Sequence, residues 1–174
     1  EGCNEQLVLT RPDVIRDIHV AYLEAGADII ETNTFGATSV VLAEYGLAHK
    51  ASEINRAAAR LAIEAAREYS TPDWPRYVAG AMGPTTKTLS VTGGITFDEL
   101  VASYYEQALA LIEAGVDLLL LETSQDTLNV KAGAIGIRQA MEKTGIRLPL
   151  MISGTIEPMG TTLAGQTIDS FYIS

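Results

Sequence analysis

The sequence alternates between amphipathic helical segments and short apolar segments, and this alternation restricts the fold more than any other feature. Four apolar segments have the length and composition of buried strands, at residues 27–35, 77–82, 116–121 and 148–153. Helical patterns fill the intervals, at residues 12–25 and 39–45, from residue 52 onward, and at residues 96–114 and 126–143. A further helix is predicted after Thr167. This order is typical of a parallel sheet with both faces covered by helices.

Residues that begin and end helices stand where this pattern requires them. Pro12 suits the first turn of a helix, and Gly26 follows the end of that helix, where a left-handed residue is common. Thr96 and Glu99 form a capping box. Ser52 is expected to be the N-cap of the helix that follows it. These signals place helix boundaries independently of the apolar periodicity.

Two stretches of the chain repeat one helix-to-strand connection. Glu24–Asp28 and Glu113–Asp117 share the pattern Glu-Ala-Gly-x-Asp, and each closes a helix and opens a strand. When the two stretches are aligned, Asn33 and Glu122 occupy equivalent positions, so they have the same strand parity: their side chains are expected on the same face of the sheet. The repeat indicates a (β/α)8 barrel or a doubly wound sheet. No G-x-G-x-x-G follows any predicted strand, which argues against a dinucleotide site.

The length of 174 residues fits one domain but not a complete (β/α)8 barrel, which takes about 250 residues. A half-barrel would leave two strand edges open. Because the chain begins just before a predicted helix and stops inside another, we expect a piece of a larger domain rather than a small doubly wound one. The predicted fold class is α/β, a partial (β/α)8 TIM barrel with about four parallel strands and flanking helices. Residues 1–174 are expected to be a single incomplete domain, truncated at both ends.

The composition argues against several classes of function. Twelve Lys and Arg against 22 Asp and Glu give a formal charge of −10, which repels phosphate backbones and argues against a nucleic-acid partner. No apolar run approaches the roughly 18 residues of a membrane-spanning helix, so no membrane partner is expected. A single cysteine excludes an internal disulfide and fits a reducing cytosol. A cytoplasmic location is therefore the expectation.

Polar residues gather at the carboxyl ends of the predicted strands, where parallel β/α folds place their functional sites. Glu122 is the most informative of them, because it directly follows four consecutive leucines. A carboxylate at the tip of a buried strand needs a partner, since an unpaired buried charge is unfavourable. A substrate ammonium group and a neighbouring Lys or Arg are the two alternatives, and the sequence leaves both open.

The other polar candidates each have a structural alternative. Asn33 and Thr34 carry groups that can donate to a substrate carboxylate, but such side chains also cap loops. Gly36 permits either close backbone approach to a ligand or a tight turn. Asp126 is interpreted as a helix N-cap before Thr127. Asn33, Thr34 and Gly36 therefore stay candidates beside Glu122.

Metal-ligating residues are few. Cys3, His19 and His49 are the only cysteine and histidines, and they are spread over three predicted elements with no shared spacing. A zinc site needs three or four converging groups. No metal ligand is therefore predicted within this chain. No cysteine or serine nucleophile stands beside a histidine in the manner of an acyl-transfer site.

Several segments, taken in order along the chain, resemble one known family. They are Gly2–Glu5, Thr10–Ile15, Ala25–Ala37, Gly83–Thr85, Gly115–Thr123, Asp126–Asn129 with Lys131–Ala132, and Thr162–Thr167. Together they resemble the homocysteine S-methyltransferase domain, most closely the N-terminal module of the cobalamin-dependent methionine synthases. No single segment is diagnostic, but the ordered set covers nearly the whole chain.

The resemblance implies a (β/α)8 barrel in which a zinc ion, held by three cysteines, binds homocysteine as a thiolate. The thiolate attacks a methyl group and gives methionine. In the cobalamin-dependent branch the donor is methylcobalamin, recharged by methyltetrahydrofolate, and the cobalamin and folate modules belong to the same polypeptide. The zinc cysteines are expected beyond Ser174, and Cys3 matches none of them.

Within this chain the resemblance covers strands two to five of the family barrel. Glu122 matches the acid that binds the homocysteine amino group. Asn33, Thr34, Phe35 and Gly36 match the loop that lines the substrate pocket. No catalytic residue of the family matches a position inside the chain.

Two alternatives to this assignment stay open. One is a homocysteine methyltransferase that uses betaine or S-methylmethionine as the methyl donor. The other is a non-catalytic β/α scaffold domain. The segment Thr10–Asp13 and the loop Gly83–Gly94 favour the cobalamin-dependent branch.

Overall fold

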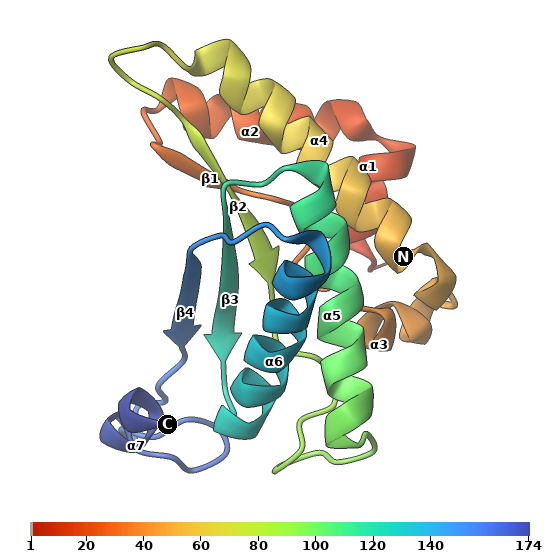
Figure 1. Cartoon of the computed structure of the whole chain (residues 1–174), viewed down its shortest axis with the longest axis vertical. Coiled ribbons are helices and arrows are strands. Elements are labelled where there is room, and N and C mark those ends of the chain that lie inside the picture. The colour runs from red at the N-terminus through yellow and green to blue at the C-terminus, as the bar shows by residue number, and fades with distance from the viewer. Residues whose placement is uncertain (1) are drawn as a thin grey trace.

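Four parallel strands form one sheet in the computed structural model, which describes residues 2–174. In spatial order they are β1 (Ile29–Glu31), β2 (Tyr77–Met82), β3 (Leu118–Ser124) and β4 (Leu150–Gly154). Each strand pairs in parallel with the next one along the chain (Figure 1). The carboxyl ends of the four strands therefore meet at one edge of the sheet, as the sequence predicts.

Helices connect the strands and pack side by side along the sheet (Figure 1). The long ones are α2 (Pro12–Glu24), α4 (Ala51–Tyr69), α5 (Phe97–Ala114) and α6 (Thr127–Thr144). The short ones are η1 (Asn4–Gln6), α1 (Leu7–Thr10), α3 (Ser39–Leu42), η2 (Ala43–Tyr45), η3 (Ala48–Lys50) and α7 (Ile168–Ile173). Within residues 2–174, none of the helices combines the length and the apolar character that crossing a membrane requires.

Capping contacts confirm one predicted helix start and correct another. The Thr96 hydroxyl accepts the Glu99 N–H, and the Glu99 carboxylate accepts the Thr96 N–H at 2.8 Å, which completes the capping box of α5. The predicted N-cap at Ser52 is wrong, because α4 begins one residue earlier, at Ala51. The Ser52 hydroxyl instead donates to Glu106 on α5 at 3.2 Å. It therefore links two helices rather than capping one.

Three strands differ in length from their predictions, and the differences in β1 and β3 bear on the site. β1 keeps only three of the predicted residues 27–35, because the backbone turns directly after it: the Thr34 N–H donates to the Thr32 carbonyl at 2.8 Å. β3 extends past its predicted end, so Glu122 lies inside the strand rather than after it. Glu122 therefore stands at the point where the pairing of β3 with β4 becomes irregular.

The main core lies between the sheet and the long helices. The strand residues that face it are Ile30, Val78, Met82, Leu119 and Leu121. They pack against buried apolar residues of α4, α5 and α6. Removing these side chains from water supplies the main driving force for folding.

The opposite face of the sheet carries the strand residues that alternate with the core-facing ones. Ala79, Leu118 and Leu120 form a small cluster separate from the main core. Towards the two sheet edges, Ile29 is 46% exposed and Met151 is 50% exposed. Within residues 2–174, this face is thus buried at its centre and exposed to solvent towards the outer strands. The expectation that helices cover both faces is not met in the part of the chain that the structure describes.

His19 lies on the core side of α2, and its burial leads us to expect that the folding stability of the protein depends on pH. Its side chain is 5% exposed, and its Nε2 has no hydrogen-bond partner within residues 2–174. Burial lowers the pKa of His19 below its ordinary value, so the unfolded chain binds this proton more tightly than the folded protein does. Stability is therefore expected to fall as the pH drops through about 6.5, the ordinary value of the unfolded state.

Urea unfolding of the full-length protein at about pH 7.5 and about pH 5 measures this effect. His19→Leu is expected to lose part of the wild-type difference in unfolding free energy between the two pH values. His49→Gln is the matched control, because His49 is the other histidine and is exposed. An identical pH dependence in His19→Leu and wild type would contradict the prediction.

Candidate functional site

The loops that follow β1 and β2 are joined at the carboxyl edge of the sheet. The Thr34 hydroxyl, in the loop after β1, donates to the Ala81 carbonyl of β2 at 2.6 Å. The Gly83 N–H, in the loop after β2, donates to the Phe35 carbonyl at 2.9 Å. The predicted loop residues therefore lie at the same edge as the end of β3, where Glu122 stands.

Glu122 lies near the carboxyl end of β3, on the face of the sheet opposite the main core. It has the parity of Leu118 and Leu120, and its side chain is half-buried. Within residues 2–174, its carboxylate takes part in no ion pair and in no hydrogen bond. A neighbouring Lys or Arg partner, one of the two alternatives, is therefore not found in this range.

The electrostatics at this position favour a cationic partner. Burial raises the pKa of Glu122 above its ordinary value, and the negative charge of Glu31 on β1 raises it further. Glu31 is itself exposed at the end of its strand. A positive group that entered here would gain attraction to both carboxylates and would relieve the repulsion between them.

Thr123, directly after Glu122, has a backbone conformation that normally favours glycine. Its φ of +54° is the only positive φ of a non-glycine residue within residues 2–174. The pairing of β3 with β4 changes register between Leu121 and Ser124, as at a β-bulge. The Thr123 N–H donates to the Ser153 hydroxyl at 3.3 Å. Strained backbone of this kind concentrates at functional sites, which supports a site beside Glu122.

The four predicted loop residues differ in what they present. The Asn33 side-chain amide donates to the Asn4 carbonyl at 2.9 Å. Thr34 is fully buried, whereas the Phe35 ring is 41% exposed. Gly36 is buried. The structure brings the four to the same edge as Glu122, and their contact with a substrate stays a prediction.

The glycine at position 36 has a local explanation. The Gly36 N–H donates to a carboxylate oxygen of Glu5, on η1, at 2.9 Å. A Cβ added at Gly36 would lie 2.7 Å from that same oxygen. The absence of a side chain at position 36 therefore lets the backbone of Gly36 approach the carboxylate of Glu5.

Sequence reasoning missed three side chains that hold this loop. Glu5, Asn55 and Gln107 bond to backbone groups of residues 34–37 from η1, α4 and α5. A signal for Gln107 was present: it stands three residues after Tyr104, on the apolar face of its helix. A polar residue on a buried helix face needs a hydrogen-bond partner, but the pattern alone does not say which one.

The loop of residues 85–94 is fastened to the start of α6. Asp126 accepts the Leu128 N–H at 3.0 Å, so its prediction as an N-cap is confirmed. The same carboxylate accepts both the N–H and the hydroxyl of Ser90, at 2.9 and 3.1 Å. Asn129 adds two further bonds to this loop. Asp126 thus also positions the loop after β2.

The described residues do not fit a zinc ion. Within residues 2–174, no group of three or more His, Cys, Asp or Glu residues is placed to hold a metal ion. The Cys3 thiol donates to Glu5 at 3.7 Å, and burial raises its pKa, which disfavours the thiolate form that metals bind. Zinc at the carboxyl edge would therefore need ligands from outside this range.

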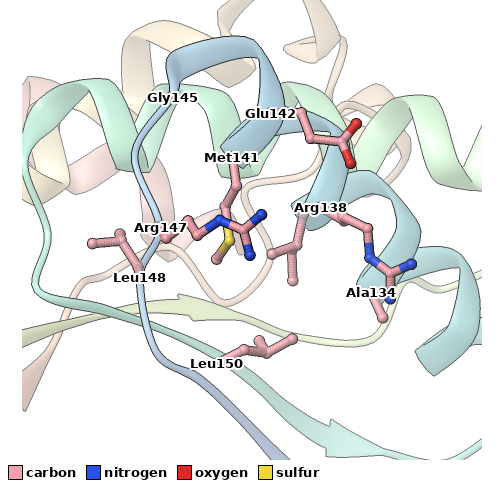
Figure 2. A pocket seen from close by; sticks show the side chains of 9 residues that line it. Ala134, Arg138, Met141, Glu142, Gly145, Arg147, Leu148 and Leu150 are labelled. Atoms are coloured by element: carbon pink, nitrogen blue, oxygen red, sulfur yellow. The ribbon is translucent and has the colours of Figure 1, made fainter.

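A cavity of about 580 Å³ lies away from this edge, beside α6 and the amino end of β4. Figure 2 shows its apolar lining, which includes Met141 and Leu150, and the charged side chains of Arg138, Glu142 and Arg147 around it. None of the predicted site residues lines it. The cavity is therefore distinct from the candidate site.

Comparisons with known proteins agree with the fold and identify a family. A family model described as homocysteine S-methyltransferase matches residues 2–174. The fold also matches crystal structures of the homocysteine methyltransferase MmuM from Escherichia coli. The TM-scores are 0.77 for its oxidised form, 0.79 for its metallated form and 0.70 for its apo form, at 22%, 22% and 23% sequence identity.

These alignments cover 94%, 97% and 96% of this chain but only 57%, 60% and 59% of the MmuM chains. The chain therefore spans about three fifths of the length of the structures that it matches. At this identity the likeness shows the fold alone. It confirms the predicted fold class: four parallel strands and their flanking helices match part of a larger barrel.

Proposed function

The chain belongs to the homocysteine S-methyltransferase family, and on this premise we propose that it forms part of a barrel that binds homocysteine and methylates its thiol to give methionine. Residues 1–174 are proposed to be one incomplete domain of this barrel. The remaining strands and helices would then come from the same polypeptide, in the cytoplasm.

The unpaired carboxylate of Glu122 carries this proposal. A half-buried charge without a partner is unfavourable for folding, so its position calls for a ligand of opposite charge. Homocysteine supplies an ammonium group, and a charge-assisted hydrogen bond to a carboxylate is among the stronger contacts available. The exposed Phe35 ring, at the same edge, offers an apolar surface for the methylene groups of the substrate.

Zinc is proposed as the metal of the complete site. Its ligands would lie outside residues 2–174, because the residues described do not fit it. When bound, zinc lowers the pKa of a thiol and so supplies the thiolate at neutral pH. The residues of this chain would act at the other end of the substrate, where Glu122 holds the ammonium group and so fixes the direction in which the thiol points.

For the methyl donor we propose methylcobalamin, recharged by methyltetrahydrofolate on other modules of the polypeptide. The resemblance of Thr10–Asp13 and Gly83–Gly94 to the cobalamin-dependent branch supports this choice. The full-length, zinc-loaded protein is expected to form methionine from homocysteine with methylcobalamin. Betaine and S-methylmethionine are expected to give no turnover above the background without enzyme.

Parallel assays with the three donors, read out as methionine formed, test this proposal. Turnover with S-methylmethionine or betaine alone would reject the cobalamin assignment but keep the family activity. No turnover with any donor, together with no homocysteine binding by calorimetry, would reject the proposed function and leave a β/α scaffold domain. Purified protein with a cooperative melt is the control for correct folding.

A further inference from the structure

Two fully buried amide side chains from different helices end on the backbone of one loop. Gln107 of α5 donates through Nε2 to the Thr34 carbonyl at 2.8 Å. Asn55 of α4 donates through Nδ2 to the Ala37 carbonyl at 2.8 Å. Both side chains are 0% exposed. The two carbonyls flank the exposed Phe35, so the amides fix the loop on both sides of it.

These amides are unfavourable residues for simply filling a core. The amide oxygens, Oε1 of Gln107 and Oδ1 of Asn55, are buried without a hydrogen-bond partner within residues 2–174. An unsatisfied buried acceptor opposes folding, whereas an apolar side chain of similar volume avoids that penalty. What both amides add is an N–H donor to the loop, and Asn55 also donates to the Ala51 carbonyl of its own helix at 2.8 Å.

Contacts from the other directions complete the restraint. The Gly36 N–H donates to Glu5 at 2.9 Å. The Thr34 hydroxyl donates to the Ala81 carbonyl and lies 2.6 Å from the Thr32 hydroxyl. Residues 34–37 are thus bonded to η1, β2, α4 and α5, while the Phe35 ring remains exposed at the edge where Glu122 stands.

We propose that Gln107 and Asn55, with Glu5, are positioning residues that hold residues 34–37 in the shape that receives homocysteine. They act through the loop backbone and do not touch the substrate. A loop already held in its bound shape loses less conformational entropy when the ligand binds, so the restraint appears as affinity. This inference rests on the proposed function and assigns Thr34 a role through the loop rather than a direct contact.

Gln107→Met in the full-length protein tests the inference, because methionine keeps the volume and the apolar contacts but removes the donor. We expect the dissociation constant for homocysteine, measured by calorimetry, to rise about three- to tenfold, the range for one lost hydrogen bond. The melting temperature is expected to stay the same or rise, because the orphaned oxygen disappears. Hydrogen exchange at the loop amides of residues 34–37 is expected to speed up.

Ser70→Ala is the matched control. Like the Gln107 amide, the Ser70 hydroxyl donates to a backbone carbonyl, that of Ala66 at 2.8 Å. It also accepts the Arg76 N–H just before β2, at the opposite end of the strands. Its removal is expected to lower the melting temperature while leaving homocysteine binding and loop exchange unchanged. If Gln107→Met proves unfolded, Glu5→Ala, at a partly exposed site, removes the Gly36 contact and is expected to weaken binding in the same way.

The outcomes separate the two proposals. Wild-type protein that does not bind homocysteine would overturn the proposed function. Wild-type protein that binds, with Gln107→Met folded and equal to it in both affinity and loop exchange, would overturn the positioning role alone. A lower melting temperature of Gln107→Met with unchanged affinity would identify Gln107 as a structural residue and would also overturn that role.

Discussion

Glu122→Gln in the full-length protein is expected to raise the dissociation constant for homocysteine roughly ten- to hundredfold, because it removes the carboxylate charge that attracts the substrate ammonium group. Glutamine has nearly the same shape, so packing against the strand is preserved. Calorimetric titration with homocysteine measures the change. An unchanged constant would remove Glu122 from the substrate site.

The same substitution is not expected to destabilise the fold. Burial and the charge of Glu31 raise the pKa of Glu122, so the folded protein binds this proton more tightly than the unfolded chain. The carboxylate of Glu122 therefore disfavours folding at pH values above its ordinary pKa. Glutamine removes that charge, and the melting temperature is expected to stay constant or rise. Weaker binding without weaker folding is the signature of a residue kept for function.

The pH dependence of binding gives a second readout. Glu122 holds an ammonium group only when it is ionised, and its raised pKa moves that ionisation upward from the ordinary value of 4.5. In wild type, homocysteine affinity is expected to increase as the pH rises through the raised pKa of Glu122. In Glu122→Gln, this pH-dependent increase in affinity is expected to be absent. Glu64→Gln, at an exposed position on α4, is the control and is expected to match wild type. Parallel pH profiles in Glu122→Gln and wild type would argue against a charged contact.

Much of the fold could be predicted because each β/α unit carries its own local signals. The four strands were found from short apolar runs, and helix ends were found from residues such as Thr96, whose capping box is local in sequence. The repeat at Glu24–Asp28 and Glu113–Asp117 predicted the same strand parity for Asn33 and Glu122, but β1 ends at Glu31, so Asn33 lies in the loop and has no strand parity. These features depend on neighbours within a few residues, which a single sequence displays directly.

The restraints on the site could not be predicted, because they depend on distant partners. Gln107 reaches a carbonyl 73 positions earlier, and Glu5 reaches an amide 31 positions later. Periodicity assigns such residues to a helix face but does not name what that face meets. The positive φ of Thr123 could not be predicted either, because threonine is a common strand residue and the neighbouring sequence gives no signal for a bulge.

The crossing of α5 and α6 depends on Gly136, and Gly136→Ala is expected to produce a large loss of stability. An added Cβ would lie 2.7 Å from the Val101 carbonyl oxygen and 2.8 Å from the Tyr105 nitrogen, both backbone atoms of α5. Backbone cannot move aside as a side-chain tip can, so the two helices must separate. Overpacking of this kind costs about 1–3 kcal/mol. Each kcal/mol lowers the melting temperature by ~2–4 °C in a domain of this size.

Gly133→Ala, one turn earlier on the same face of α6, is the matched control. Its added Cβ would meet the tip of the Leu121 side chain at 2.8 Å, a group that can rotate away. Both substitutions gain the same helix propensity of about 1 kcal/mol, so the difference between them isolates the backbone contact. Thermal melts of the two full-length variants measure that difference, and Gly136→Ala is expected to melt lower. Equal melting temperatures would show that α6 shifts on α5 without penalty, and would contradict a close backbone crossing as the reason for glycine at position 136.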